Sequence, residues 1–238
     1  MITVGTTLAA YKMTGDPRNA MSWLSNAEAV QASVDDDVRY FVALETDARG
    51  LEPFRPLLDR LNQIGGARWQ FSLDDGATVI TGANRVRRIC IGQNLVGDYA
   101  INAQASHVLF LASDVQVRDD VLPRLLELDA PVTACHVPTY GFGSQFLPIP
   151  EYAANGWDVR SHMETCCAMM LRRDVFSRLR WRYDLDRGMT DDPSMFADVT
   201  ELLHEQVLSR HDVIATHYPA SVPSIEDRHS DEQRRIHR

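Results

Sequence analysis

The segment HVLFLASDVQVR, residues 107–118, begins with an apolar run that is followed closely by a carboxylate, Asp114. Residues 107–112 predict a short buried strand, because a parallel strand that is covered on both faces is apolar without alternation. Asp114 follows directly after this strand. In open α/β sheets, ligands bind at the carboxyl ends of the strands. A carboxylate at this position is suited to hold a hard cation against phosphate oxygens.

Strands and helices alternate along the rest of the chain. Apolar runs of strand length are predicted at residues 1–7, 38–44, 68–73, 132–137, 166–171 and 212–217. Helical spacing of apolar residues predicts helices at 20–33, 53–64, 86–105, 119–128, 174–180 and 193–209. This order is typical of an α/β domain with a mostly parallel, twisted central sheet, flanked by helices and joined by right-handed crossovers.

Two segments have no periodic pattern. Residues 138–158 combine prolines with aromatic side chains and predict a long loop, which either lines an acceptor cleft or folds over its own aromatic residues. The last twenty residues, 219–238, form a polar tail that could order over a bound ligand.

Composition narrows the class of protein. The 238 residues are 45% hydrophobic and suit one large domain with a sizeable core. The net charge of −9 gives no basic footprint for nucleic acid. Arginines do cluster around residues 85–88 and 172–182, where solvated helix faces are the default interpretation. No apolar run is long enough to span a membrane, and the four cysteines form no C-x-x-C pair, so we expect a cytoplasmic protein with reduced thiols.

Several common catalytic signatures are missing from the sequence. It contains neither the phosphate-binding pattern G-x-x-x-x-G-K-[ST] nor a G-x-G-x-x-G after the first strand. The G-x-S-x-G nucleophile elbow of the α/β-hydrolases is absent as well.

Three features converge on one kind of site. Asp114 follows the strand at 107–112, although it could simply cap a turn. Asp192 lies in MTDDPSMFADV, residues 189–199, where an aspartate followed by Pro193 also fits a helix N-cap. His217 ends the apolar strand DVIATH and could equally be a buried structural histidine.

The order of these features resembles that of the GT-A glycosyltransferases, and of the family 2-like nucleotide-sugar-dependent enzymes in particular. RICIGQNLVGDYAINAQASHVLFLASDV resembles their segment from a helix with an R-N-x-G-like element into the strand before the D-x-D motif. CCAMMLRRDVF resembles their acceptor-side strand, and TDDPSMF their E-D-x-x-F element. His217 falls where many members place a late metal-binding histidine. The resemblance covers residues 1–218 in the right order.

The resemblance implies roles for the residues around the D-x-D position. Asp114 corresponds to the last carboxylate of D-x-D, the one expected to touch the metal. Ala112 stands where the first aspartate would be, so Ser113 or another loop would have to take over its contact with the donor. Asn94 corresponds to the asparagine of the R-N-x-G-like element, where Gln93 replaces the arginine.

Other donor contacts are implied near the first strands. Thr7 and Asp47 end the first two strands and correspond to the pocket for the nucleobase and ribose. Asp74 and Asp75 are a second candidate for that pocket. By the same resemblance, residues 1–118 form the nucleotide-sugar-binding half of one GT-A domain and residues 119–218 its acceptor-binding half.

The implied reaction is transfer of a sugar from a nucleoside-diphosphate donor, most often a UDP-sugar in the family, to an acceptor hydroxyl. Asp114 and His217 would hold Mn²⁺ or Mg²⁺. Asp192 would act as the general base, with inversion at the anomeric carbon. Asp191 would orient the acceptor or, by like-charge repulsion, raise the proton affinity of Asp192.

Two other functions remain open at this point. A nucleotidyltransferase uses a similar sheet and metal, but TTLAAYKMTGDPR, residues 6–18, lacks the usual glycine cluster after the first strand. A non-catalytic nucleotide-sugar-binding module is the other, and Ala112 favours it. The acceptor class is also open: protein, glycan, small molecule, lipid-linked sugar or nucleic acid.

Overall fold

The computed structural model describes residues 1–9, 18–72, 82–113, 115–136, 158–159, 168–184, 186–187, 191–214 and 216–217. Within these ranges, only the backbone is described for residues 18–22, 82–85, 136, 158–159, 191–193, 209–214 and 216–217. Asp74, Asp75, Asp114, most of the predicted loop at 138–158 and the tail at 219–238 lie outside the described residues.

In the part of the chain that the structure describes, the main sheet has eight strands, and a separate two-stranded sheet accompanies it. The main sheet contains β1 (Ile2–Ala9), β2 (Val38–Glu45), β3 (Ala67–Phe71), β4 (His107–Leu111), β6 (Val132–His136), β7 (Asp158–Val159), β8 (Ala168–Arg172) and β9 (Val207–Ile214). The small sheet pairs β5 (Val115–Gln116) with β10 (Thr216–His217). The helices are α2 (Arg18–Ala32), the short 3-10 helix η1 (Glu52–Phe54), α3 (Arg55–Gln63), α4 (Gly82–Asn102), α5 (Val121–Leu126), α7 (Arg173–Phe176) and α8 (Asp191–Leu202).

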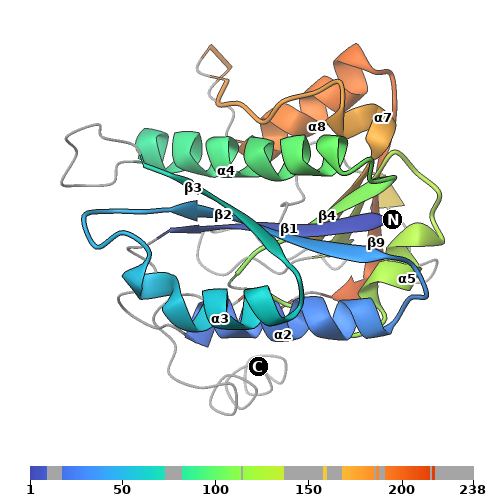
Figure 1. Ribbon diagram of the computed structural model, residues 1–238. Helices are drawn as coiled ribbons and strands as arrows, with labels where there is room; N and C mark the ends of the chain where they lie inside the picture. Colours follow the sequence, from blue (N-terminus) through green and yellow to red (C-terminus); the bar gives the residue numbers. More distant parts are fainter. Residues whose placement is uncertain are drawn as a thin grey trace, which may run out of the picture.

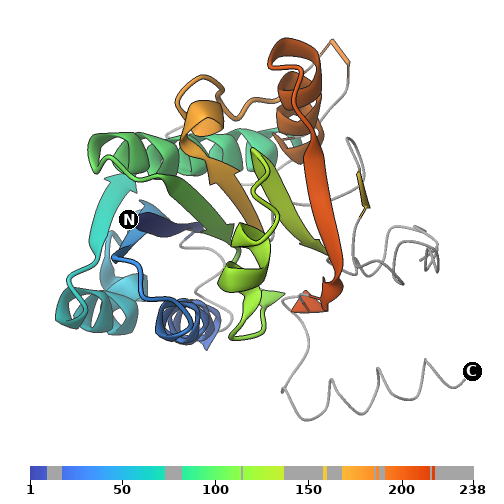
Figure 2. The same cartoon turned by 90° about the vertical axis from the view of Figure 1, so that its right-hand side faces the viewer.

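The strand order of the main sheet is β3-β2-β1-β4-β8-β6-β9-β7. The first four strands run parallel, β8 lies antiparallel between β4 and β6, and β6 and β9 are again parallel. The edge strand β7 is antiparallel to β9. The predicted α/β fold, with a mostly parallel sheet flanked by helices, is therefore confirmed (Figures 1 and 2).

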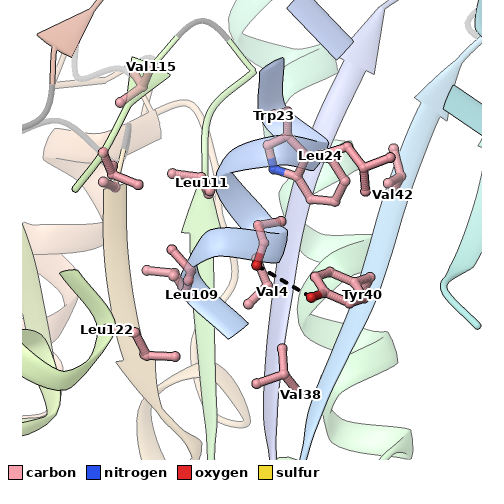
Figure 3. Close-up of a cluster of buried hydrophobic side chains, with 14 of the residues drawn as sticks. Val4, Trp23, Leu24, Val38, Tyr40, Val42, Leu109, Leu111, Val115 and Leu122 are labelled. Carbon is pink, nitrogen blue, oxygen red and sulfur yellow. Dashed lines mark hydrogen bonds between the residues drawn. The ribbon is translucent and has the colours of Figure 1, made fainter. Parts of the chain in front are cut away.

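Helices cover both faces of the sheet and enclose two apolar cores. In Figure 1, α4, α7 and α8 lie above the sheet, and α2, α3 and α5 lie below it. Side chains alternate along each strand, so neighbouring residues of one strand enter different cores. Val42 and Leu109 face the α2–α3–α5 side, shown in Figure 3, whereas Phe41 and Phe110 face the α4–α8 side.

Two glycines allow α4 to lie unusually close to the sheet. A Cβ on Gly5 of β1 would come within 2.3 Å of the Val96 side chain on α4. A Cβ on Gly92 of α4 would come within 2.2 Å of the Thr7 side chain. Contacts this short would force the helix away from the strand, so the small residues set the distance between the two elements.

One predicted helix is wrong over its last turns. The helix expected at 193–209 ends at Leu202, and residues 207–214 form β9 beside β6. His204 has a φ of 57°, in the left-handed region that ends helices. The same helix begins at Asp191, so Asp192 lies inside its first turn and not at the predicted N-cap. The hydrogen-bonded pairing with β6 outweighs the helical spacing of the sequence.

The described helices include none that is long and apolar enough to cross a membrane. The expected cytoplasmic location stays a prediction. Both predicted halves of the chain contribute strands to the one main sheet, and the division at residue 118 stays a prediction as well.

Tyr40 joins β2 to α2 in the first core. Its side chain is 3% exposed and lies in the first core, close to Val38 and Val42 of the same strand (Figure 3). Its hydroxyl lies within hydrogen-bonding distance of the Ala27 carbonyl oxygen and of Gln31 Oε1. Burial, together with the nearby charge of Glu28, raises the pKa of Tyr40 to about 12.

We predict that Tyr40 makes the protein sensitive to alkali. In the unfolded chain its hydroxyl ionises near pH 10, whereas in the folded chain it stays protonated up to about pH 12. Its contribution is complete below pH 10 and is lost as the pH rises towards 12, by about 2.5 kcal/mol. Urea unfolding at pH 9 and pH 11.5 should show a smaller loss of stability in Tyr40→Phe than in the parent; equal losses would contradict the prediction.

Candidate functional site

The carboxyl ends of β2, β1 and β4 lie side by side in the sheet, and three of the predicted donor residues belong to these strands or follow them. Thr7 belongs to β1, Asp47 follows β2 after Thr46, and Ser113 follows β4 after Ala112. The fold thus brings Thr7, Asp47 and Ser113 to one edge of the sheet, as the sequence predicted. Whether they bind a donor stays a prediction.

Thr7 lies beneath α4. It is two residues short of the end of β1, and its side chain packs against Gly92. Its hydroxyl oxygen is buried and has no hydrogen-bond partner among the described residues. A buried hydroxyl without a partner is unfavourable, so this oxygen is free to accept or donate a bond to a ligand that reaches beneath the helix.

Asp47 faces solvent at the same edge. Its Oδ1 accepts hydrogen bonds from the Arg49 backbone N–H at 2.9 Å and from Arg49 Nε at 3.0 Å. These bonds, with the charge of Arg49, lower the pKa of Asp47. The carboxylate is therefore ionised over the whole neutral range, as a hydrogen-bond acceptor for ribose hydroxyls must be.

The residues directly before and after Asp114 are fixed by packing and by a hydrogen bond. Ser113 is buried, and Ala112 packs against the first core, so no carboxylate stands at the position of the first D-x-D aspartate. Beyond Asp114, the Val115 side chain is buried in the same core. Asn26 of α2 donates a 2.8 Å hydrogen bond from Nδ2 to the Val115 carbonyl oxygen.

The small sheet places His217, the second predicted metal ligand, beside Val115. Backbone pairing between β10 and β5 sets His217 directly opposite Val115, the residue after Asp114 (Figure 2). Opposite residues of an antiparallel pair have Cα atoms about 5 Å apart. A carboxylate and an imidazole are a donor pair that suits Mn²⁺, so the residues present fit the predicted metal. Within the described residues no group of three metal-binding side chains occurs, and the side chains of both predicted ligands lie outside that set.

Asp191 and Asp192 form the first turn of α8. Only their backbone is described. A helix N-terminus carries partial positive charge, which favours carboxylates in the first turn in their ionised form. Both residues are therefore placed where an ionised carboxylate is stable; their catalytic role stays a prediction.

Asn94 has partners that the resemblance did not imply. Its Nδ2 donates to the Trp181 carbonyl oxygen at 2.9 Å, and its Oδ1 accepts from the Trp181 N–H at 2.8 Å. The amide thus joins α4 to the segment before α8, and in this arrangement it is engaged on both sides. The predicted contact between Asn94 and a donor is not tested by these bonds.

A buried ion pair at the same edge was missed by the sequence analysis. Glu45, the last residue of β2, pairs with Arg88 of α4, and their side chains are only 6% and 12% exposed. Glu45 interrupts an apolar strand at its end, which is the one signal that could have singled it out. Nothing in the sequence relates Glu45 to a residue 43 positions away.

The arginines at 172–182 are mostly paired with carboxylates. Arg172 pairs with Asp174 at 2.8 Å and Arg180 with Asp98 at 2.9 Å. Arg182 contacts Asp198 at 2.8 Å and Asp184 at 2.9 Å, and these bonds raise the pKa of its guanidinium. These carboxylates offset the positive charge of three of the five arginines in the cluster.

Comparison with solved structures decides the fold. A crystal structure of an active-site mutant of LgtC aligns with a TM-score of 0.50 over 93% of this chain and 88% of that chain, at 14% sequence identity. The chain has a GT-A glycosyltransferase fold. The identity is too low to carry activity, donor or mechanism from LgtC to this chain.

Two further structures are similar over less of their length. The galactosyltransferase LgtC in complex with donor and acceptor sugar analogues aligns with a TM-score of 0.46 over 82% of this chain and 69% of that chain, at 15% identity. A197 from STIV aligns with a TM-score of 0.42 over 76% and 85%, at 11% identity. No family model and no curated protein matches the sequence, so the likeness to family 2 stays a prediction.

We predict that Glu45→Gln destabilises the protein by about 3 kcal/mol, because it removes the charge of the buried Glu45 carboxylate from its contact with Arg88. Asp47→Asn is the matched control, since it removes an ion pair whose side chains are 40% and 42% exposed, and should change stability by less than about 1 kcal/mol. Urea unfolding at pH 7 measures both. Equal effects of the two substitutions would refute a special role for the buried pair.

Proposed function

We propose that this protein is a metal-dependent glycosyltransferase that moves a sugar from a nucleoside-diphosphate donor, with UDP favoured, to an acceptor hydroxyl. The observation that carries the proposal is the pairing of β10 with β5, which joins His217 to the segment after Asp114 at the carboxyl edge of a GT-A sheet. The pairing sets the backbone of His217 beside Val115, which follows β4 at the edge where ligands bind in α/β folds.

In this proposal Asp114 and His217 hold Mn²⁺ or Mg²⁺. The bound cation would neutralise the charge that the leaving diphosphate gains. Thr7 and Asp47, from β1 and the end of β2, bind the nucleoside, and Ser113 supports the donor next to Asp114. With Ala112 at the first D-x-D position, these neighbouring groups replace the missing carboxylate.

Asp192 is the proposed general base. The acceptor oxygen forms a bond to the anomeric carbon while the bond from that carbon to the diphosphate oxygen breaks. The hydroxyl proton passes to the Asp192 carboxylate. A single displacement of this kind inverts the anomeric configuration. Asp191, beside it in the first turn of α8, orients the acceptor or raises the proton affinity of Asp192 by repulsion.

A non-catalytic nucleotide-sugar-binding module is the second candidate, favoured by one observation. Ala112 packs against the first core and supplies no carboxylate to the site. A protein of this kind would bind a nucleoside-diphosphate sugar with metal and release no nucleoside diphosphate. The nucleotidyltransferase alternative would instead consume a nucleoside triphosphate and a sugar phosphate, and release pyrophosphate.

We predict metal-dependent nucleotide binding that requires Asp114. Thermal-shift measurements with UDP, GDP, CDP and dTDP, each with and without Mn²⁺, should show one nucleotide that raises the Tm by about 5 to 10 °C only with the metal, as expected at about 100 times its Kd. Asp114→Ala should abolish this shift. Asp119→Asn, which alters an exposed carboxylate five positions further on, should keep it. Absence of any nucleotide shift in the parent would overturn the proposal.

The role of Asp192 has its own test. Asp192→Asn should lower the turnover number about 10²- to 10⁴-fold and leave the KM for the donor sugar unchanged, because a general base acts in the transition state. Release of UDP from UDP-galactose with Mn²⁺ measures both constants, with water as the acceptor. Asp59→Asn, an exposed residue of α3 outside the proposed machinery, should behave like the parent. Turnover close to that of the parent would exclude Asp192 as the base.

A further inference from the structure

A short segment before α8 is attached to two helices at once. We call residues 180–187, of which 185 is not described, the strap. Its first residues bind α4: Arg180 pairs with Asp98 at 2.9 Å, and the Trp181 backbone forms both hydrogen bonds with the Asn94 amide. Asn94 and Asp98 are four residues apart and thus lie on one side of α4. The strap therefore follows a single face of this helix.

The Trp181 side chain anchors the same end of the strap in the core. It is 5% exposed, and its ring contacts Phe110 of β4 edge-on, with centroids 5.4 Å apart. The strap is thus fixed at this end by backbone hydrogen bonds and by a buried aromatic contact, which leaves little freedom for the residue that follows.

The other residues of the strap bind α8. Arg182 makes a two-pronged contact with Asp198, from Nε to Oδ2 at 3.0 Å and from Nη2 to Oδ1 at 2.8 Å. Arg187 makes a similar contact with Glu201, at 3.0 and 2.8 Å. Asp184 links the two arginines, because it binds the Arg182 guanidinium and accepts a bond from the Arg187 N–H.

The two contacts with α8 differ in burial. The Asp198 side chain is 7% exposed, whereas that of Glu201 is 52% exposed. A carboxylate that is removed from water depends on its partner, so the loss of that partner is more damaging than for an exposed carboxylate. The Arg182–Asp198 contact is therefore the one that fixes the helix to the strap.

The end of the strap and Asp198 both lie close in sequence to the first turn of α8. Only three residues separate Arg187, the last residue of the strap, from Asp191, the first residue of α8. Asp198 lies six residues after Asp192, about 9 Å along the helix axis. Ser194 to Val199 are buried, so the helix between these points has little room to shift on its own.

We infer that Arg182 is a positioning residue: through Asp198 it holds α8, the helix whose first turn carries Asp191 and Asp192. This inference rests on the proposed function of Asp192. It also couples the helix that carries the base to α4, which covers the donor side, because one strap binds both (Figure 1). A displacement of about 1 Å at a reacting group can reduce turnover about 100-fold, so small movements of α8 matter.

The test compares three variants of the full chain. Asp198→Asn removes the buried charge, Arg182→Lys keeps the charge but loses the two-pronged geometry, and Glu201→Gln is the control on the same helix. Amide hydrogen exchange in residues 194–199 should accelerate at least about 10-fold in Asp198→Asn, less in Arg182→Lys, and not at all in Glu201→Gln.

Turnover gives the second readout, which general damage to the fold would not reproduce. With UDP-galactose and Mn²⁺, UDP release should fall about 10- to 100-fold in Asp198→Asn and Arg182→Lys, with the donor KM within about 2-fold of the parent. Unchanged exchange at α8, or a rise in KM that matches the fall in turnover, would overturn the inference. If the parent releases no UDP, the proposed function fails at that point, and hydrogen exchange alone decides whether the strap holds α8.

Discussion

The close approach of α4 to β1 is the constraint on which the rest of the molecule depends. Gly5 and Gly92 themselves add no side chain between the two elements, so the Val96 and Thr7 side chains fill this space. From this position α4 reaches Glu45 through Arg88, and the strap through Asn94 and Asp98. A larger side chain at either glycine would move the helix and, with it, every contact that the helix carries.

Much of the fold could be predicted from the sequence, because burial on both faces of a sheet leaves a plain pattern. The apolar run predicted at 107–112 forms β4, which ends at Leu111, and the alternation of strands and helices around it gives the α/β class correctly. The helix expected to continue to Ser209 is the main exception. Residues 207–214 become β9 because β6 offers a partner strand, and a single sequence does not reveal its long-range partners.

The residues of the candidate site also differ in whether they could be predicted from the sequence. Thr7, Asp47 and Ser113 could be placed at one edge because each belongs to a strand end or follows it, and strand ends are visible in the sequence. Glu45 with Arg88, and Arg182 with Asp198, could not be predicted, since both pairs join residues that only the folded sheet and helices bring together. Asn94 is a third case: the resemblance implied a donor contact, which stays a prediction, and the structure shows hydrogen bonds with the Trp181 backbone.

One strand of the sheet has a consequence for how the chain folds. The antiparallel β8 lies between β4 and β6, although it follows both in the sequence. Until residues 168–172 have been synthesised, the outer edge of β4 has no neighbour and the second half of the sheet cannot join the first. The two halves of the sheet therefore join late, and non-local strand pairings of this kind form slowly. We expect a nascent chain that stops before β8 to expose the β4 edge and to need protection from aggregation.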